Sequence, residues 1–277
     1  MTQPAACLAV LGTGSDVGKS VVATALCRIF ADRGLRVAPF KAQNMSNNSG
    51  VTPEGLEMGR AQIVQAEAAR VAPHCDMNPV LLKPVSDQGS QVVLNGRAWL
   101  EASGRAYYAR KDELFAESCA ALARLRRTCD LVIMEGAGSC AEVNLMAGDI
   151  VNLRMAAHAD APVLLVADID RGGVFAQIVG TLACVPEEQR ERIRGFVINR
   201  FRGDLGLFTS GVEWIEAQTG RPVFGVLPWY RHFRIEAEDA VVIEQTRAFT
   251  PSTTGEAAIA VIRLPHISNF TDFEPLT

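Results

Sequence analysis

The chain has 277 residues, of which 48% are hydrophobic and 21% are charged. That balance is typical of globular proteins and excludes an intrinsically disordered or collagen-like chain. The formal net charge of −4 is too small to indicate binding to nucleic acid or to a membrane surface through bulk charge. At about 150 residues per domain, the length favours two domains, or one large α/β domain with an additional piece.

Short apolar runs alternate with longer amphipathic stretches along the chain. Strands are expected at 6–11, 36–40, 80–82, 91–94, 131–134, 163–167, 195–198 and 223–227, and helices at 19–33, 58–71, 105–127, 174–184 and 207–219. Because the strands are apolar without polar alternation, they predict a parallel sheet buried on both faces. The alternation predicts a doubly wound α/β fold, with a mostly parallel sheet and helices on both faces.

The segment 12–20, GTGSDVGKS, follows the first expected strand and opens the first expected helix. This context is typical of a P-loop, in which backbone N–H groups and a helix N-terminus hold phosphate, so the fold expected is that of the P-loop NTPases. Lys19 is expected on the β- and γ-phosphates and the Ser20 hydroxyl on Mg²⁺. The residues expected to bind nucleotide in this loop are Thr13, Gly14, Ser15, Asp16, Val17, Gly18, Lys19 and Ser20.

The loop departs from two related patterns. The strict P-loop has glycine where this chain has Thr13, so a glycine-rich turn without a ligand is the alternative. Positioning ATPases of the chromosome-partitioning type usually carry a second lysine where this chain has Gly14, which disfavours that class.

Polar residues also follow the other strands, at the sheet edge where ligands bind in α/β folds. Glu135 follows strand 131–134 and precedes two glycines, so it is expected to hold Mg²⁺, with a solvated turn acid as the alternative. Lys41 follows strand 36–40 and is expected to stabilise charge on a transferring phosphoryl group in the same crevice. Asn199 follows strand 195–198 and is expected at the nucleotide base; the guanine signature Asn-Lys-x-Asp is missing, which favours ATP.

Amides, acids and arginines near these strand ends are expected to bind a polar substrate that carries carboxylates and amides, although a plain surface loop is the alternative for any one amide. These residues are Gln43, Asn44, Asn47, Asn48, Arg60, Glu142, Asn144 and Arg171. Helix capping is the alternative reading for Asp149 and Asp170.

The cysteines, the apolar runs and the N-terminal sequence indicate where in the cell the protein is expected. The 7 cysteines contain no Cys-x-x-Cys pair, so buried thiols in a reducing environment are expected rather than a disulfide or metal framework. The apolar run 161–167 is far shorter than the ~20 residues that span a bilayer. No basic segment precedes the first apolar stretch, so no signal peptide is expected and the sequence predicts a cytoplasmic protein.

An ordered set of segments resembles the cobyric acid synthase family, which is related in fold to dethiobiotin synthetase. The segments are 12–20, 40–49, 55–66, 77–96, 135–145, 149–152, 168–176, 199–204 and 225–229, within a resemblance that covers nearly all of 7–277. It implies a ligase of cobalamin biosynthesis that uses ATP and Mg²⁺ to amidate side-chain carboxylates of adenosylcobyrinic acid a,c-diamide, giving cobyric acid. Acyl-phosphate intermediates and ammonia, from glutamine or free, are implied as well.

The resemblance also implies residue roles. Lys19 and Lys41 would neutralise the transferring phosphoryl group, and Asp149 and Asp168 would lie at the reacting carboxylate. The implied metal ligands are Ser20, Glu57 and Glu135. The family usually has lysine where this chain has Arg200, which bears on base recognition.

The implied organisation is a synthetase domain at 1–249, a linker at 250–256, and the first strand and tail of a truncated glutaminase-like domain at 257–277. The amidotransferase cysteine and histidine are missing from this sequence, so a separate glutaminase domain or free ammonia would be the nitrogen source. The partners expected are a corrinoid and ammonia, with no nucleic acid and no membrane, and related synthetases suggest a homodimer. The alternatives are another dethiobiotin-synthetase-like carboxylate ligase and a nucleotide-switched assembly ATPase.

Overall fold

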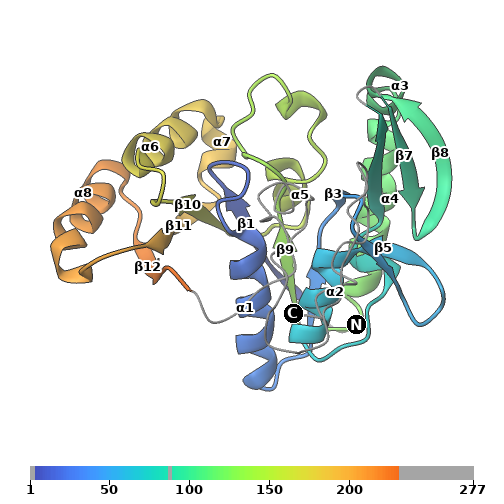
Figure 1. Ribbon diagram of the computed structural model, residues 1–277, viewed down its shortest axis with the longest axis horizontal. Helices are drawn as coiled ribbons and strands as arrows, with labels where there is room; N and C mark the ends of the chain where they lie inside the picture. Colours follow the sequence, from blue (N-terminus) through green and yellow to red (C-terminus); the bar gives the residue numbers. More distant parts are fainter. Residues whose placement is uncertain (1–3, 87–88, 231–277) are drawn as a thin grey trace, which may run out of the picture.

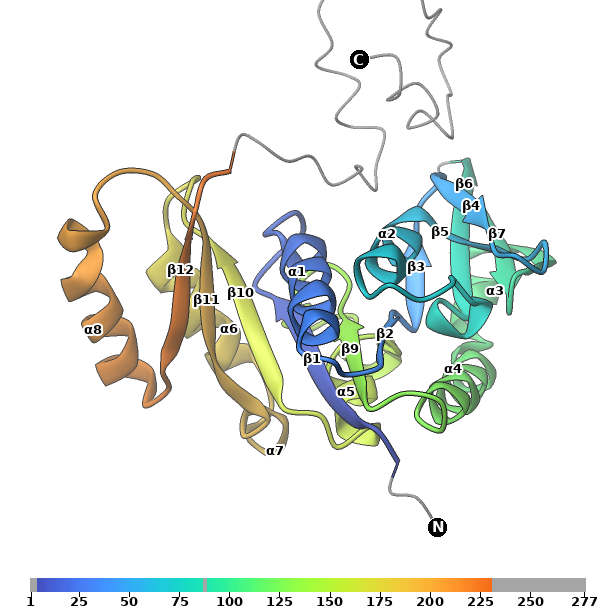
Figure 2. The ribbon, with the colours of Figure 1, turned by 90° about the horizontal axis from the view of Figure 1, so that it is seen from below.

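The computed structural model describes residues 4–86 and 89–230. The expected linker at 250–256 and the expected strand and tail at 257–277 lie outside the described residues. The main sheet is entirely parallel, with the strand order β12-β11-β10-β1-β9-β2 (Figures 1 and 2). Its strands are β1 (Ala6–Gly12), β2 (Val37–Phe40), β9 (Leu131–Glu135), β10 (Val163–Asp168), β11 (Ile193–Phe201) and β12 (Val223–Pro228).

Helices cover both faces of the main sheet, as the sequence predicts (Figure 2). Val10 points to one face, where it packs in a cluster with Val22 of α1. Its neighbour Leu11 points to the other face and belongs to the larger core cluster, with Met155 of α5 and Ile178 of α6. The helices are α1 (Lys19–Asp32), α5 (Leu153–His158) and α6 (Val174–Cys184).

A second, four-stranded sheet corrects the expectation of one sheet. Strands 80–82 and 91–94 belong to this sheet, whose order is β3-β6-β7-β8. They pair antiparallel, because the few residues between them cannot form the crossover that parallel strands need. A tight turn at Asn95 and Gly96, both with positive φ, then joins β7 to β8. The strands are β3 (Gln43–Met45), β6 (Val80–Ser86), β7 (Gly89–Leu94) and β8 (Arg97–Ser103).

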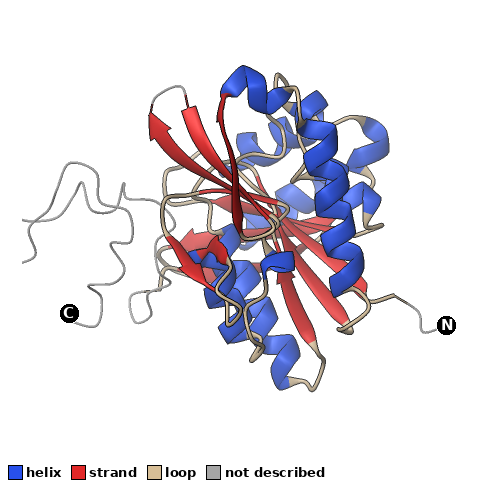
Figure 3. Cartoon of the chain, turned by 90° about the vertical axis from the view of Figure 1, so that its right-hand side faces the viewer, coloured by secondary structure: helices blue, strands red, loops and turns tan. Residues whose placement is uncertain are grey.

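Smaller elements complete the described part of the chain, in which helices flank the strands (Figure 3). The expected helix 105–127 is interrupted at Ala109 and Arg110 and forms two helices, and the expected helix 58–71 is shorter. These elements are β4 (Ser49–Val51), β5 (Glu57–Gly59), α2 (Arg60–Ala68), α3 (Gly104–Tyr108), α4 (Lys111–Leu125), α7 (Glu187–Arg190) and α8 (Thr209–Thr219), with 3-10 turns at Cys75–Met77, Met146–Gly148 and Leu205–Phe208.

The structure bears on two further features of the chain, its apolar helices and its cysteines. In the ranges 4–86 and 89–230, none of the helices combines the length and apolarity that crossing a membrane requires. All the cysteines are free thiols, but Cys184 is exposed and Cys119 and Cys129 are partly exposed, so the expectation of buried thiols was wrong for these three.

The position of β1 defines the edge of the sheet that matters for ligands. It lies between β9 and β10. The next strand of this sheet along the chain, β2, lies on the β9 side of β1, whereas the later strands β10, β11 and β12 lie on the opposite side. In doubly wound sheets such a reversal opens a crevice beyond the carboxyl ends of the strands. The residues after β1, β2, β9 and β10 therefore converge at one edge.

Candidate nucleotide and substrate site

The loop between β1 and α1 has the backbone of a phosphate cradle. Gly18 caps α1 in the left-handed region, with φ of 98°. A Cβ atom on Gly18 would lie 2.0 Å from Asn199 Nδ2, and one on Gly12 would lie 2.7 Å from Val17 Cγ2. Only glycine fits both positions, and the helix N-terminus that follows favours an anion.

Lys19 folds back over this loop. Its side chain is largely buried, and Nζ donates hydrogen bonds to the main-chain oxygens of Gly14 at 2.9 Å and Gly138 at 2.8 Å. These carbonyls belong to the P-loop and to the loop after β9. The ammonium charge therefore lies over the cradle, where the sequence predicts a phosphate-binding lysine.

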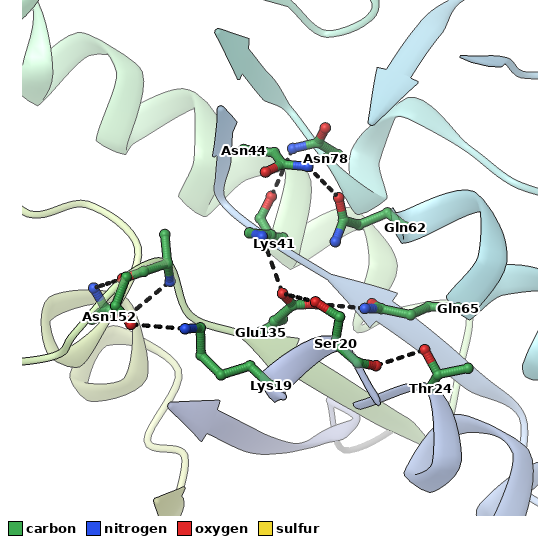
Figure 4. Close-up of polar contacts among 12 residues, drawn as sticks. Lys19, Ser20, Thr24, Lys41, Asn44, Gln62, Gln65, Asn78, Glu135 and Asn152 are labelled. Carbon is green, nitrogen blue, oxygen red and sulfur yellow. Dashed lines mark hydrogen bonds and ion pairs between the residues drawn. The ribbon is translucent and has the colours of Figure 1, made fainter. Parts of the chain in front are cut away.

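Glu135 is the centre of a buried polar cluster at the ends of β1, β2 and β9 (Figure 4). It is 2% exposed, and its Oε1 accepts hydrogen bonds from Ser20 Oγ at 2.8 Å and from Lys41 Nζ at 3.0 Å. Its Oε2 accepts a hydrogen bond from Gln65 Nε2. Burial raises the pKa of Glu135, but the charge of Lys41 and the hydrogen bonds from Gln65, Ser20 and Lys41 together hold that pKa below its ordinary value.

The expected metal ligands are only partly brought together. The Ser20 hydroxyl and the Glu135 carboxylate are in contact, and both are hard oxygen ligands of the kind that Mg²⁺ prefers. Glu57 instead lies in β5, where its Oε1 accepts hydrogen bonds from Ser49 Oγ and Lys83 Nζ, each at 2.6 Å.

Asn199 and Arg200 brace the P-loop from the end of β11. The buried Asn199 donates from Nδ2 to the main-chain oxygen of Val17 at 3.0 Å. Arg200 bridges two acids, since its guanidinium lies 2.9 Å from Asp16 Oδ1 and 2.8 Å from Asp168 Oδ2. The loop and the ends of β10 and β11 are therefore tied together.

Both oxygens of Asp168 have partners, because Oδ1 accepts from the backbone N–H of Asp170 at 2.8 Å. The side chain of Asp170 pairs with Arg202 at 2.8 Å, and Gly173 is the N-cap of α6, so the capping alternative for Asp170 was wrong. The capping alternative for Asp149 was wrong as well, because Asn152 is the N-cap of α5 and Asp149 Oδ1 accepts from the N–H groups of Val151 at 2.8 Å and Asn152 at 3.2 Å, in a turn that precedes the helix.

The expected substrate residues occupy three different surroundings. Asn44 and Asn48 are buried, whereas Gln43 and Asn47 are half-buried. Gln43 accepts a hydrogen bond from the hydroxyl of Tyr107. Glu142, Asn144 and Arg171 are exposed, and Arg60 donates its backbone N–H to the oxygen of Asn48 at 3.1 Å.

A cavity of about 230 Å³ lies beside the P-loop. Its lining joins the first part of the loop to the end of β10 and the start of α6. Arg171 thus faces a hollow next to the phosphate cradle, 3.7 Å from Asp16. The lining residues are Thr13, Gly14, Ser15, Val17, Asp168, Arg171 and Gln177.

Sequence reasoning missed Gln65 and Asn78. Asn78 is 1% exposed, and its side chain donates to the main-chain oxygens of Lys41 at 3.1 Å and Val80 at 3.0 Å while accepting from Gly59 N at 3.0 Å. It therefore fixes both the backbone of Lys41 and the start of α2. For Gln65 a signal existed, because Gln62 and Gln65 are spaced to share one face of the expected helix.

The fold, the cradle and the buried lysine–glutamate cluster define a P-loop nucleotide-binding domain. Residues 8–242 match the CobQ/CobB/MinD/ParA nucleotide binding domain, and the chain belongs to that family.

Similar proteins are known for nearly the whole chain. It is 62% identical to the cobyric acid synthase of Chlorobium phaeobacteroides over 269 residues, which is 96% of this chain and 54% of that protein. The cobyric acid synthase of Sorangium cellulosum is 55% identical over 96% of this chain and 51% of its own length. The resemblance stated from the sequence is thereby confirmed, and the chain spans about half the length of these curated relatives.

Solved structures give more distant likenesses. The signal recognition particle receptor FtsY from Elizabethkingia anophelis in complex with GDP has a TM-score of 0.45 and 18% identity, covering 80% of this chain and 57% of that one. The signal recognition particle 54 kDa protein from Aeropyrum pernix in complex with GDP has a TM-score of 0.43 and 16% identity, covering 83% of this chain and 43% of that one.

Proposed function

We propose that this chain carries the synthetase activity of a cobyric acid synthase: ATP-dependent amidation of side-chain carboxylates of adenosylcobyrinic acid a,c-diamide. Its similarity to cobyric acid synthases supports the substrate class. The observation that carries the reaction type is the convergence of Lys19, Lys41 and Glu135 beside a P-loop. This arrangement suits phosphoryl transfer, which depends mainly on positioning and charge neutralisation.

The residues present fit a magnesium nucleotide. The backbone of 13–18 would hold the phosphates, and the glycines at 12 and 18 let the loop take this shape, because a Cβ atom at either position would clash with Val17 or Asn199. Ser20 and Glu135 would hold Mg²⁺. The family resemblance implies Glu57 as a further ligand, and its carboxylate would then have to exchange its contacts with Ser49 and Lys83 for the metal. When bound, Mg²⁺ neutralises charge on the phosphates. Asn199 would contact the base, which the missing guanine signature suggests is adenine.

The chemistry needs an activated carboxylate. Attack of ammonia on a carboxylate would have to expel oxide, whereas transfer of a phosphoryl group to a carboxylate oxygen gives an acyl phosphate and ADP. Ammonia then forms the C–N bond as the C–O bond to phosphate breaks, and a proton from nitrogen is lost to solvent. Lys19 and Lys41 would stabilise the transferring group, with Asp149 and Asp168 near the reacting carboxylate.

The corrinoid would lie across the edge lined by the amide and acid loops. The amide and carboxylate side chains of the corrinoid would form hydrogen bonds with the side chains of Gln43, Asn44, Asn47 and Asn48. Arg171, beside the cavity next to the P-loop, is matched to a carboxylate that reaches the phosphoryl group. We also propose that ammonia comes from a glutaminase domain and that the protein is a homodimer in the cytoplasm. The synthetase domain would end at residue 249, and the glutaminase-like domain would begin at residue 257.

The test is amidation by the purified chain. Incubation with the a,c-diamide, ATP, Mg²⁺ and ammonium should give products of stepwise higher amide content by mass spectrometry, and a parallel reaction with glutamine tests the nitrogen source. ATP hydrolysis should require both the corrinoid and ammonia. Hydrolysis that is indifferent to corrinoid would contradict the proposal and favour a nucleotide-switched ATPase.

A further inference from the structure

Helix α2 carries two glutamines that are completely buried, Gln62 and Gln65, each 0% exposed. Because they are three residues apart, they lie on the same side of the helix. Gln62 Oε1 accepts a hydrogen bond from Asn44 Nδ2 at 3.2 Å, and Gln65 Nε2 donates to Glu135 Oε2 (Figure 4). One helix therefore contacts both the amide loop and the carboxylate beside the P-loop.

Each glutamine also has a buried polar atom without a hydrogen-bond partner among the described residues. These atoms are Gln62 Nε2 and Gln65 Oε1. A buried amide that is only half satisfied costs free energy, so a methionine or leucine would fill the same space at lower cost. Packing alone does not explain an amide at either position.

The contact to Glu135 explains the amide of Gln65. The two oxygens of Glu135 have different partners, since Oε1 accepts from Ser20 and Lys41 and Oε2 accepts from Gln65. Without the third donor, the carboxylate is free to turn about its last bond. With it, the plane of the carboxylate is set and Oε1 is directed at Ser20.

The helix is itself held in register with this cluster. Asn78 accepts from the N–H of Gly59, the N-cap of α2, and donates to the main-chain oxygen of Lys41. The same buried side chain thus fixes the start of the helix that carries Gln65 and the backbone of the lysine that pairs with Glu135. Asn78 therefore holds in place both of the segments from which Gln65 and Lys41 reach Glu135.

We propose that Gln65 is a positioning residue of the magnesium-nucleotide site, which orients the Glu135 carboxylate so that it and the Ser20 hydroxyl face the metal together. This inference rests on the proposed function only for the presence of that site. Residues that orient metal ligands typically change metal affinity by about 10- to 100-fold when they are replaced.

The experiment compares Gln65→Met with Gln62→Met, a matched control on the same face of the same helix. Affinity for ATP is measured by calorimetry with and without Mg²⁺. Gln65→Met should weaken binding of ATP with Mg²⁺ by about tenfold and leave binding without Mg²⁺ within about twofold. Gln62→Met, which among the described residues loses only a hydrogen bond to Asn44, should leave both affinities within about twofold.

Equal behaviour of the two folded variants, or an unchanged effect of Mg²⁺ in Gln65→Met, would overturn the inference. A loss of ATP affinity that is the same with and without Mg²⁺ would indicate a merely structural role and also overturn it. If Gln65→Met does not fold, Gln65→Asn provides the same comparison, because its shorter amide does not reach Glu135. Wild-type protein that binds ATP with Mg²⁺ but amidates no corrinoid would contradict the proposed function, whereas the role of Gln65 is judged from binding.

Discussion

Lys41 Nζ lies 3.0 Å from Glu135 Oε1, and their side chains are only 4% and 1% exposed. Removing two charges from water is expensive, and their attraction compensates only when further hydrogen bonds satisfy the remaining sites. Ser20 and Gln65 provide such bonds to Glu135. An ion pair kept in this position, at the carboxyl ends of β2 and β9, is therefore better explained by the chemistry of the site than by stability.

The pair predicts strong coupling between two substitutions. Glu135→Gln and Lys41→Met should each lower the free energy of unfolding by about 3–5 kcal/mol, because each removes one member of a buried ion pair. The double variant should lose less than the sum of the two. Urea denaturation of the four proteins measures this cycle, and additive losses would show that the charges do not interact.

The same pair predicts the sign of a pH effect. In the wild type the pKa of Glu135 is held below its ordinary value, so its contribution to stability is complete above about pH 4.3 and is lost as the pH falls through the lower folded value. In Lys41→Met the cation is gone and burial dominates, so the pKa of Glu135 should rise above that of the unfolded chain. The contribution of this group is then present at low pH and lost as the pH rises.

Urea denaturation of Lys41→Met between about pH 4 and pH 8 would reveal that reversal as stability that falls with rising pH relative to wild type. Arg36→Ala, which removes the exposed partner of Asp130, serves as a control that changes a different carboxylate. A Lys41→Met profile parallel to that of the wild type would contradict the stated cause of the shift.

Lys19 is predicted to act on the reaction and not on the fold. Its ammonium group is bound by main-chain carbonyls of Gly14 and Gly138, so Lys19→Ala should leave the circular dichroism spectrum unchanged. Amidation should fall by at least about 10²- to 10³-fold, the cost of removing one preorganised group that faces developing charge. A folded Lys19→Ala protein with wild-type amidation rates would remove the basis for the P-loop role.

The sequence predicted the parts of the site that follow directly from strand order. Glu135 and Lys41 each come after an apolar strand, and in a parallel sheet the ends of neighbouring strands meet at one edge. Gln65 and Asn78 could not be found in this way, because their roles depend on which side of α2 faces β9 and on the approach of 77–80 to Lys41. Strands 80–82 and 91–94 were assigned to the wrong sheet, since an apolar run does not reveal its partner.

Arg200 is predicted to stiffen the P-loop. Its guanidinium bridges Asp16 of the loop and Asp168 at the end of β10. The exposed pairing with Asp16 adds little stability, whereas Asp168 is buried and loses the guanidinium partner that Arg200 provides in Arg200→Met. We expect a destabilisation of about 1–3 kcal/mol, and nucleotide affinity about tenfold weaker because binding must then order a looser loop.

Arg200→Lys should recover only part of this loss, since a single ammonium group does not reproduce a planar bridge between two carboxylates. The matched control is Arg202→Met, which removes a neighbouring guanidinium that pairs with Asp170 and stacks on Trp229. Arg202 has no ion pair with the P-loop among the described residues, so its replacement should leave nucleotide affinity within about twofold. Calorimetric titration of the three variants with ATP decides the question: equal losses in Arg200→Met and Arg202→Met would mean that the bridge does not act through the loop.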